Sequence, residues 1–283
     1  MTNSALISEN VGSSAAPPIT PTDTRAPADT SYLDRIEQTL ADVTTVIDAD
    51  AQVENQLAVS VVIPTYNERE TLREIVAKVR EVGLHYEIII VDDGSTDGSR
   101  EVLRELAELK DVQVLFHDVN CGKGAALRSG VQFARGEVIL VQDADLEYDP
   151  ADYERMLAPL KSGAADAVYG SRFEENPHQD PSWVHRFANR MLTQLSNYTT
   201  GQQLTDMETC YKVFRRELLD RMTLSQNRFG CEPELTAKLA RHGARIAEVP
   251  ISYRSRGYHE GKKIGWRDGI NTLYCIFRYA WFD

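Results

Sequence analysis

From about residue 58 onward, short runs of apolar, mostly β-branched residues alternate with longer segments of helical periodicity. Continuous apolar runs are typical of strands buried on both faces of a parallel sheet, and the segments between them would be helices that cover that sheet. The predicted strands are residues 59–63, 87–93, 112–116, 137–143 and 166–170. The alternation predicts an α/β protein with an open, doubly wound, mostly parallel sheet, whose ligands bind at the carboxyl ends of the strands.

Helices dominate the second half of the chain. Their predicted ranges are residues 183–198, 210–222 and 232–243, and a last strand is predicted at residues 247–253. In the first half, the helix after the first strand is predicted to begin at Asn67. This N-cap residue is followed three positions later by Glu70, as in a capping box.

Residues 1–57 differ in composition from the rest of the chain. Residues 1–30 contain four of the eleven prolines among Ala, Ser and Thr, with few large apolar side chains, which is typical of disorder. In residues 32–57, apolar residues recur at three- and four-residue steps, which predicts one amphipathic helix. We therefore expect a disordered tail plus an amphipathic helix over residues 1–57, and one folded domain over residues 58–283.

Charge and cysteine content exclude several classes of protein. The formal net charge of -12 argues against nucleic-acid binding, and the four cysteines form no C-x-x-C pair that would indicate a disulfide framework or a zinc site. The six histidines have no spacing typical of a metal site or of a Ser-His-Asp triad. No apolar run approaches the ~20 residues that cross a bilayer, and the N-terminus lacks the features of a signal peptide. We therefore expect a cytoplasmic protein.

Acidic motifs, rather than glycine-rich phosphate loops, follow the predicted strands. The chain contains neither G-x-G-x-x-G nor G-x-x-x-x-G-K-[ST]. The sequence DDGSTD (92–97) suits two interpretations: a turn with a helix cap, or carboxylates that accept hydrogen bonds from a base or a ribose. An extended segment would place Asp143, Asp145 and Glu147 on one side, where they can share a divalent cation with a diphosphate. We expect a cation there because clustered carboxylates beside a buried strand are costly without a counter-ion.

Five motifs occur along the chain in this order: VVIPTYNE (61–68), VDDGSTD (91–97), NCGKG (120–124), DAD (143–145) and GSR (170–172). The set resembles the motifs of family-2 glycosyltransferases with the GT-A fold, in particular those of the dolichol-phosphate mannose synthase (dolichol-phosphate mannosyltransferase) and polyprenyl-phosphate glycosyltransferase group. The resemblance spans about residues 58–270. It implies that residues 58–283 form a GT-A glycosyltransferase domain.

The same resemblance implies how a nucleotide diphosphate sugar, GDP-mannose or UDP-glucose, would be bound. The matching positions are Pro64, Tyr66 and Glu68 for base and ribose, Asp93 for reading the base, Lys123 for the nucleotide, and Asp143 for the ribose or a phosphate.

A cation and a basic loop complete the implied donor site. Asp145 matches the principal ligand of Mg²⁺ or Mn²⁺ in the DXD motif, and Glu147 stands where this group often has glutamine as a second ligand. After the last predicted strand, a basic segment with glycines would close over the diphosphate as a lid. Its cationic residues include Arg256, Lys262 and Lys263.

Three further residues match the acceptor side of the family's site. Arg172 and Arg186 match arginines that bind the acceptor phosphate, and Asp206, in the segment DMETCYK (206–212), lies near the reaction centre in an orienting or basic role. With Asp145, they are the predicted catalytic residues.

The implied reaction is an inverting, metal-dependent transfer of a hexose, mannose or glucose, from the nucleotide sugar to a polyprenyl or dolichyl phosphate. Two alternatives stay open. In the first, the acceptor is a hydroxyl group of a polysaccharide or glycolipid, which requires a catalytic base. In the second, the chain is a non-catalytic nucleotide-sugar-binding subunit of a membrane-protein partner.

The last segment bears on localisation. Residues 270–282 are too few to span a bilayer, but they are rich in aromatic residues. They predict either peripheral contact with the inner face of the membrane or a final helix packed on the core, and the two can coexist.

Overall fold

The computed structural model describes residues 38–39, 57–173, 183–255 and 266–282. The chain divides into two compact units, Met1–Glu54 and Asn55–Asp283. Residues 38–39 are helical, and Leu57 packs against the core of the second unit. The rest of the predicted tail and its helix lie outside the described residues.

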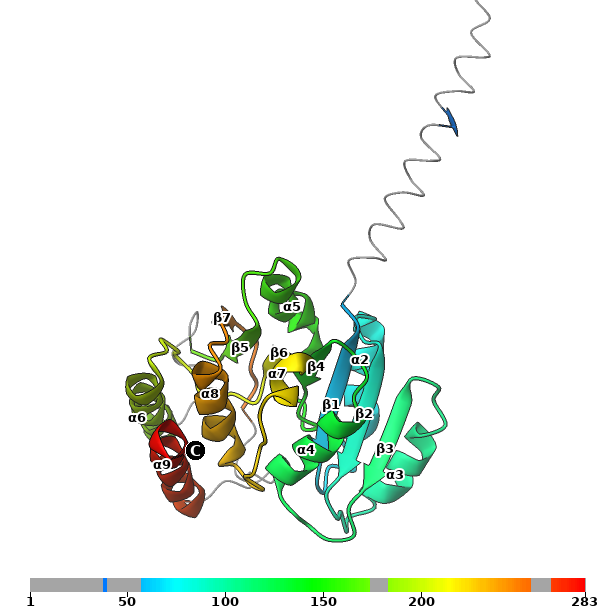
Figure 1. Ribbon diagram of the computed structural model, residues 1–283. Coiled ribbons are helices and arrows are strands. Elements are labelled where there is room, and N and C mark those ends of the chain that lie inside the picture. Colours follow the sequence, from blue (N-terminus) through cyan, green and yellow to red (C-terminus); the bar gives the residue numbers. More distant parts are fainter. Residues whose placement is uncertain (1–37, 40–56, 174–182, 256–265, 283) are drawn as a thin grey trace, which may run out of the picture. The chain divides into compact units, whose positions relative to one another are not determined.

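One mixed sheet forms the centre of the second unit (Figure 1). Its strands are β1 (Val59–Thr65), β2 (Glu87–Asp92), β3 (Val112–Phe116), β4 (Val138–Val141), β5 (Ala167–Ser171), β6 (Lys212–Arg215) and β7 (Ile246–Pro250). The strand order is β3-β2-β1-β4-β6-β5-β7, and β6 alone among these runs antiparallel to its neighbours. The prediction of a doubly wound, mostly parallel sheet is confirmed.

Helices cover both faces of this sheet. They are α2 (Leu72–Val82), α3 (Ser99–Leu106), α4 (Lys123–Phe133), α5 (Tyr153–Lys161), α6 (Trp183–Thr200), α7 (Arg216–Asp220), α8 (Cys231–Arg241) and α9 (Trp266–Trp281), with a 3-10 turn η1 (Pro150–Asp152) before α5. One buried cluster joins α2, α3 and α5 to one face, and a second joins α4, α6, α8 and α9 to the other. In β1, Val61 and Ile63 belong to the first cluster and Val62 to the second, which explains the continuous apolar run.

The predicted helix over residues 210–222 is wrong for its first part. Residues 212–215 form β6, and a short helix, α7, follows it. The apolar positions in this stretch are compatible with a helix as well as with a strand. The strand forms because β6 pairs with both β4 and β5 in the sheet. Since β6 is antiparallel, its first residue pairs with the last residue of β4, Val141. The segment before β6 therefore reaches the edge at which the parallel strands end.

The predicted start of the first helix is also wrong. α2 begins at Leu72 after the N-cap residue Thr71. Asn67 instead adopts the left-handed region with φ 54°, which asparagine tolerates better than most residues. Its side-chain oxygen accepts a hydrogen bond from the Thr96 amide at 2.8 Å, so Asn67 joins the loop after β1 to the loop after β2.

Candidate active site

The carboxyl ends of β1, β2 and β4 bring three of the predicted motifs to one edge of the sheet. Thr65 pairs with Asp92, and Val62 pairs with Val141, so the loops that follow these strands leave the sheet side by side. Pro64, Tyr66 and Glu68 are partly buried at or just after the end of β1. The amide of Glu68 donates to Ser99 Oγ at 3.0 Å, so the loop after β1 also contacts the first residue of α3.

Asp93, directly after β2, is buried, and its carboxylate holds the loop that leads into α4. Its Oδ1 accepts from the amide of Cys121 at 2.9 Å, and Oδ2 accepts from the amide of Gly122 at 2.7 Å. Gly122 has φ 99°, and a Cβ atom there would lie 2.4 Å from the carbonyl oxygen of Asn227. These contacts fix the loop before Lys123, and reading of the base by Asp93 stays a prediction.

His117 lies between this carboxylate and α4. Its Nδ1 is 2.8 Å from Asp93 Oδ1, and its Nε2 is 2.9 Å from Ser129 Oγ. The structure thus forms an Asp-His-Ser chain that sequence spacing did not predict. The ligand atoms of Asp93, His117 and Cys121 also lie within 4.8 Å of one another. Because the carboxylate and both ring nitrogens already have partners in this loop and on α4, we do not assign the group to a metal ion.

Lys123, the first residue of α4, is the cation at the centre of the site. Its Nζ lies 2.7 Å from Asp143 Oδ1, 2.6 Å from Cys210 Sγ and 3.8 Å from Glu232 Oε1. Burial alone would lower the pKa of Lys123, but the nearby acidic groups, Asp143 first, outweigh it and raise the pKa well above its usual value. Lys123 therefore stays charged and joins α4, the loop after β4 and α8.

The acidic segment after β4 is a turn and not the extended segment that the sequence predicted. Leu146 has φ 61°, a conformation that is uncommon and strained for a residue with a branched side chain. The reversal lets the amide of Glu147 donate to Asp145 Oδ1 at 3.1 Å. Tyr253, after β7, donates its hydroxyl to Glu147 Oε2 at 2.9 Å. Two partly buried carboxylates thus share one turn, and their oxygens are the donors that Mg²⁺ and Mn²⁺ prefer.

Arg172 and Asp206 form a buried ion pair at the same edge. Arg172 Nε and Nη2 donate to the two carboxylate oxygens at 2.6 and 2.8 Å, and the Arg172 amide donates to Oδ2 at 3.1 Å. Asp206 is fully buried, and the charge of Asp206 raises the pKa of Arg172 well above its usual value although burial opposes this. Glu248 of β7 accepts the amides of Thr205 and Asp206. The pair is therefore rigidly placed.

Several residues of this site were given no role by the sequence. Lys212, the first residue of β6, is buried; its Nζ contacts Glu232 of α8 and lies 4.6 Å from the centre of the Tyr169 ring. The apolar pattern predicted a helix at Lys212, and no motif included Glu232. Glu208 is a third such residue, and its Oε1 is a buried atom without a hydrogen-bond partner among the described residues.

Four predicted residues remain, one on α6 and three in the predicted lid. Arg186 lies in α6 and is partly buried. Arg256, Lys262 and Lys263 of the predicted lid lie outside the described residues.

Several known glycosyltransferases are similar to this chain. The sequence matches the family model described as Glycosyl transferase family 2 over residues 60–223. It is 34% identical over 200 residues to Glycosyltransferase AglJ of Haloferax volcanii. It is 32% identical over 224 residues to the undecaprenyl-phosphate 4-deoxy-4-formamido-L-arabinose transferase of Edwardsiella ictaluri. The alignments cover 70% and 77% of this chain but 64% and 66% of those relatives, so the chain spans about two thirds of their length.

Solved structures show the same fold. Glucosyl-3-phosphoglycerate synthase of Mycobacterium tuberculosis, in complex with Mn²⁺ and UDP-glucose, superimposes with a TM-score of 0.63 at 21% identity, over 80% of this chain and 82% of that chain. The same enzyme was also solved with Mg²⁺ and UDP. Mannosyl-3-phosphoglycerate synthase of Rubrobacter xylanophilus gives a TM-score of 0.64 at 21% identity, over 82% of this chain and 75% of that chain. The predicted GT-A fold is confirmed.

Proposed function

The chain belongs to glycosyl transferase family 2, and from this premise we propose that it transfers a hexose, mannose or glucose, from a nucleotide diphosphate sugar to a polyprenyl or dolichyl phosphate, with inversion. The observation that carries the proposal is the buried Arg172–Asp206 pair, which holds a guanidinium group at the sheet edge that also bears the acidic turn. A guanidinium held in this way suits an anionic acceptor. The Edwardsiella relative is an undecaprenyl-phosphate transferase, which supports the same acceptor class.

The donor would lie over the carboxyl ends of β1, β2 and β4. Asp145 and Glu147 would hold a Mg²⁺ or Mn²⁺ ion, which when bound neutralises charge on the diphosphate leaving group. Lys123 adds a fixed positive charge at the same edge, because Asp143 and Glu232 keep it in place. Pro64, Tyr66, Glu68 and Asp93 would contact the base and ribose, and the segment with Arg256, Lys262 and Lys263 would cover the diphosphate.

The acceptor would lie on the side of Arg172. The Asp206 carboxylate accepts hydrogen bonds from Nε and Nη2 of the guanidinium group, so Nη1 points away from the ion pair. Arg172 would bind the acceptor phosphate, with Arg186 as a second cation, and Asp206 acts as the residue that orients Arg172. A phosphate monoester is already ionised at neutral pH, so alignment and leaving-group charge would be the main barriers.

Donor and metal can be identified in one experiment. The purified chain is incubated with GDP-mannose or UDP-glucose and a short polyprenyl phosphate, in the presence of Mg²⁺, Mn²⁺ or EDTA. We expect one donor to be consumed much faster than the other, with activity lost in EDTA and restored by one of the two ions. Equal activity in EDTA would contradict the metal site. No sugar transfer from either donor would contradict the proposed pairing of donor and acceptor.

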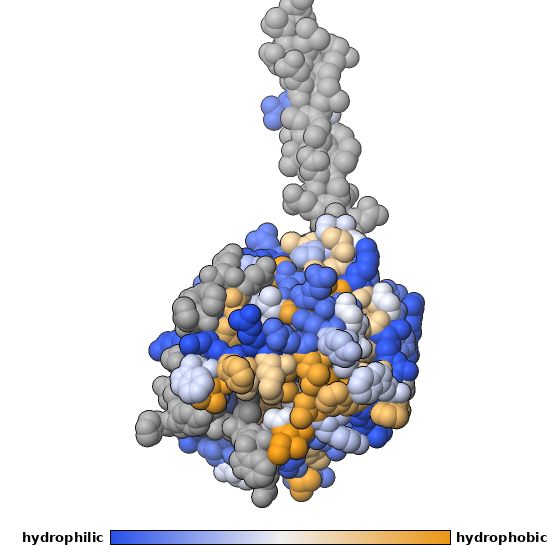
Figure 2. All heavy atoms as spheres, turned by 90° about the vertical axis from the view of Figure 1, so that its left-hand side faces the viewer, coloured by the Kyte–Doolittle hydropathy of each residue, from blue (hydrophilic) through white to orange (hydrophobic). Residues whose placement is uncertain are grey.

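Contact with a membrane surface is a further part of the proposal, because the acceptor is a lipid. Among the described residues, no helix is long and apolar enough to span a bilayer. Side chains of α6 and α9 nevertheless gather into an exposed apolar surface, and Figure 2 shows hydrophobic residues clustered on this side of the protein. Its exposed members are Trp183, Val184, Phe187, Met191 and Tyr198, together with Ile270, Leu273, Tyr274, Trp281 and Phe282. We name these residues the α6–α9 surface.

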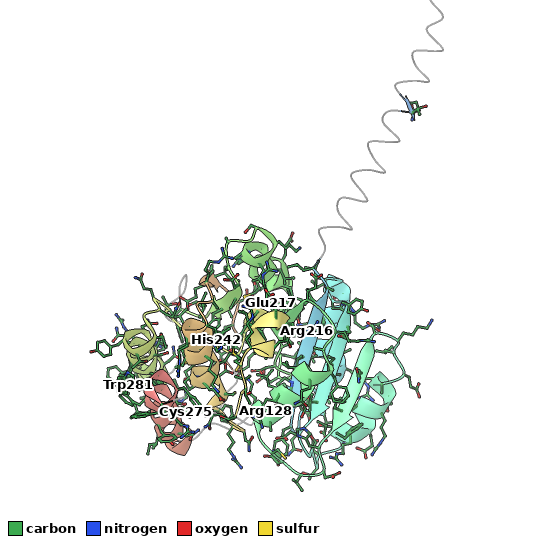
Figure 3. All side chains as sticks on the ribbon, viewed as in Figure 1. Arg128, Arg216, Glu217, His242, Cys275 and Trp281 are labelled. Carbon is green, nitrogen blue, oxygen red and sulfur yellow. The ribbon has the colours of Figure 1, made fainter. Side chains whose placement is uncertain are left out.

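One face of α9 is buried and the other is exposed, as contact with a membrane surface requires. Cys275 and Tyr279 are buried, while Trp281 is 58% exposed at the outer edge of the protein (Figure 3). One face of the helix therefore packs on the core while aromatic side chains stay exposed, as expected for an interfacial helix.

Replacing Phe187, Tyr274 and Trp281 by serine should weaken binding to vesicles about 10- to 100-fold, because three apolar side chains no longer enter the interface. Co-sedimentation with vesicles that contain anionic lipid measures this. Tyr86→Ser is the matched control, since Tyr86 is 57% exposed and belongs to neither α6 nor α9. Substitution is preferable to truncation of α9, which would also remove buried core residues. Unchanged sedimentation of the triple variant would remove this surface from the proposal.

A further inference from the structure

Glu208 carries a carboxyl group that the described contacts leave unused. It lies in the segment between Asp206 and Cys210, which leads into β6. Its Oε1 is buried and has no hydrogen-bond partner among the described residues. A buried carboxyl oxygen without a partner costs free energy, and such an atom in a native site calls for an explanation. The neighbours of Glu208 supply one.

The charged groups around Glu208 come from four segments and are already paired with one another. Arg172, after β5, pairs with Asp206 of the same segment as Glu208. Lys212 of β6 pairs with Glu232 of α8. Burial and the charge of Glu232 raise the pKa of Glu208 to about 8, although Lys212 and Arg172 oppose the shift. At neutral pH, Glu208 therefore carries a proton and can donate a hydrogen bond.

We propose that Glu208 is a hydrogen-bond donor to the acceptor phosphate, placed beside Arg172 at the reaction centre. The inference rests on the proposed function and adds a second residue, besides Arg172, that binds the acceptor phosphate. A neutral carboxyl group can bind a phosphate dianion by donating its O–H, whereas a carboxylate in the same place would repel it. Arg172 and Glu208 would thus hold the acceptor together, one by charge and one by a neutral hydrogen bond.

No proton needs to leave Glu208 during the reaction. An ionised oxygen of the acceptor phosphate forms a bond to the anomeric carbon of the sugar. The bond between that carbon and the diphosphate oxygen breaks, and its electron pair leaves with the nucleoside diphosphate. The product is a sugar phosphodiester, and Glu208 keeps its proton.

The pH dependence of transfer tests the proposal. The acceptor phosphate gains its second charge near pH ~6, and Glu208 loses its proton near pH 8. We expect kcat/KM for a short polyprenyl phosphate to fall as the pH rises through about 8. In Glu208→Gln, the amide donates at every pH, so this variant should stay active and lose the alkaline fall. Glu208→Ala should lose about 10- to 100-fold in kcat/KM for the acceptor.

The matched control is Glu217→Gln. Glu217 lies on α7 with a side chain that is 63% exposed, and it is labelled in Figure 3. This variant should keep both the rate and the pH profile of the wild type. Circular dichroism and a thermal melt of each variant show whether it is folded.

Three other outcomes would contradict either the donor role of Glu208 or the proposed function. If Glu208→Gln is folded but inactive towards polyprenyl phosphate, the site needs a carboxylate, and the donor role is wrong. If Glu208→Gln is active and keeps the alkaline fall, another group titrates and the donor role is again wrong. If the wild type transfers sugar to a hydroxyl acceptor and not to polyprenyl phosphate, the proposed function fails, and the role of Glu208 fails with it. The wild-type assay alone identifies that case.

Discussion

Asp145→Asn is expected to remove almost all sugar transfer while leaving the fold intact. Asp145 and Glu147 share the turn that Leu146 creates, and the amide of Glu147 already donates to Asp145 Oδ1. Asparagine keeps the shape and one oxygen but loses the charge that would balance a divalent cation beside a diphosphate. Loss of charge stabilisation of this kind costs about 10²- to 10³-fold in kcat.

Two measurements check this expectation. Initial rates with the preferred donor give the loss of turnover, and titration with Mn²⁺ in the presence of the nucleoside diphosphate gives the loss of metal affinity. Asp220→Asn, a neutralisation at the exposed last residue of α7, is the control and should behave as the wild type. Turnover by Asp145→Asn at the wild-type rate would show that the cation site lies elsewhere.

The second large effect is expected on stability, at the Arg172–Asp206 pair. Asp206→Ala would leave a buried guanidinium group without its counter-ion, and it would also leave the Arg172 amide unpaired. Breaking one side of a buried ion pair costs about 3–5 kcal/mol. We expect the free energy of unfolding in urea to fall by that amount, and kcat/KM for the acceptor to fall because Arg172 is no longer held in place.

Glu105→Ala provides the comparison for this variant. Glu105 pairs with Arg73, and both side chains are more than half exposed. Surface ion pairs of this kind contribute about 0–1 kcal/mol. If the free energy of unfolding falls equally in the two variants, the buried Arg172–Asp206 pair contributes no more to stability than an exposed pair.

The sheet was predictable because its strands are buried on both faces. In the central parts of β1 and β2, residues 61–63 and 88–91, alternate side chains enter different core clusters, so each of these positions is apolar and a continuous run marks the strand. β6 lacks this signal: it has four residues, begins with a lysine and ends with an arginine. Its place in the sheet follows from pairing with β4 and β5, which are distant in sequence.

The site was predictable to the extent that its residues sit at strand ends. Lys123 and Asp143, placed by motif, lie in direct contact, and Arg172 and Asp206 form one pair. The turn at Leu146 was not predictable, because a leucine gives no local signal for a positive φ. Residues of the β6 segment and α8 were missed for another reason. Buried lysines and glutamates are stable only as pairs, and the pairing of Lys212 with Glu232 exists only in the folded chain.

The central claim is that the acceptor is a polyprenyl phosphate. The most direct test offers the wild-type chain two acceptors with the same hydrocarbon chain, a short polyprenyl phosphate and the matching polyprenol, each with the preferred donor and metal ion. Mass spectrometry of the lipid products then shows which acceptor gained a sugar. We expect a product one hexose residue heavier from the phosphate, and no product from the alcohol. Transfer to the alcohol, with none to the phosphate, would contradict it.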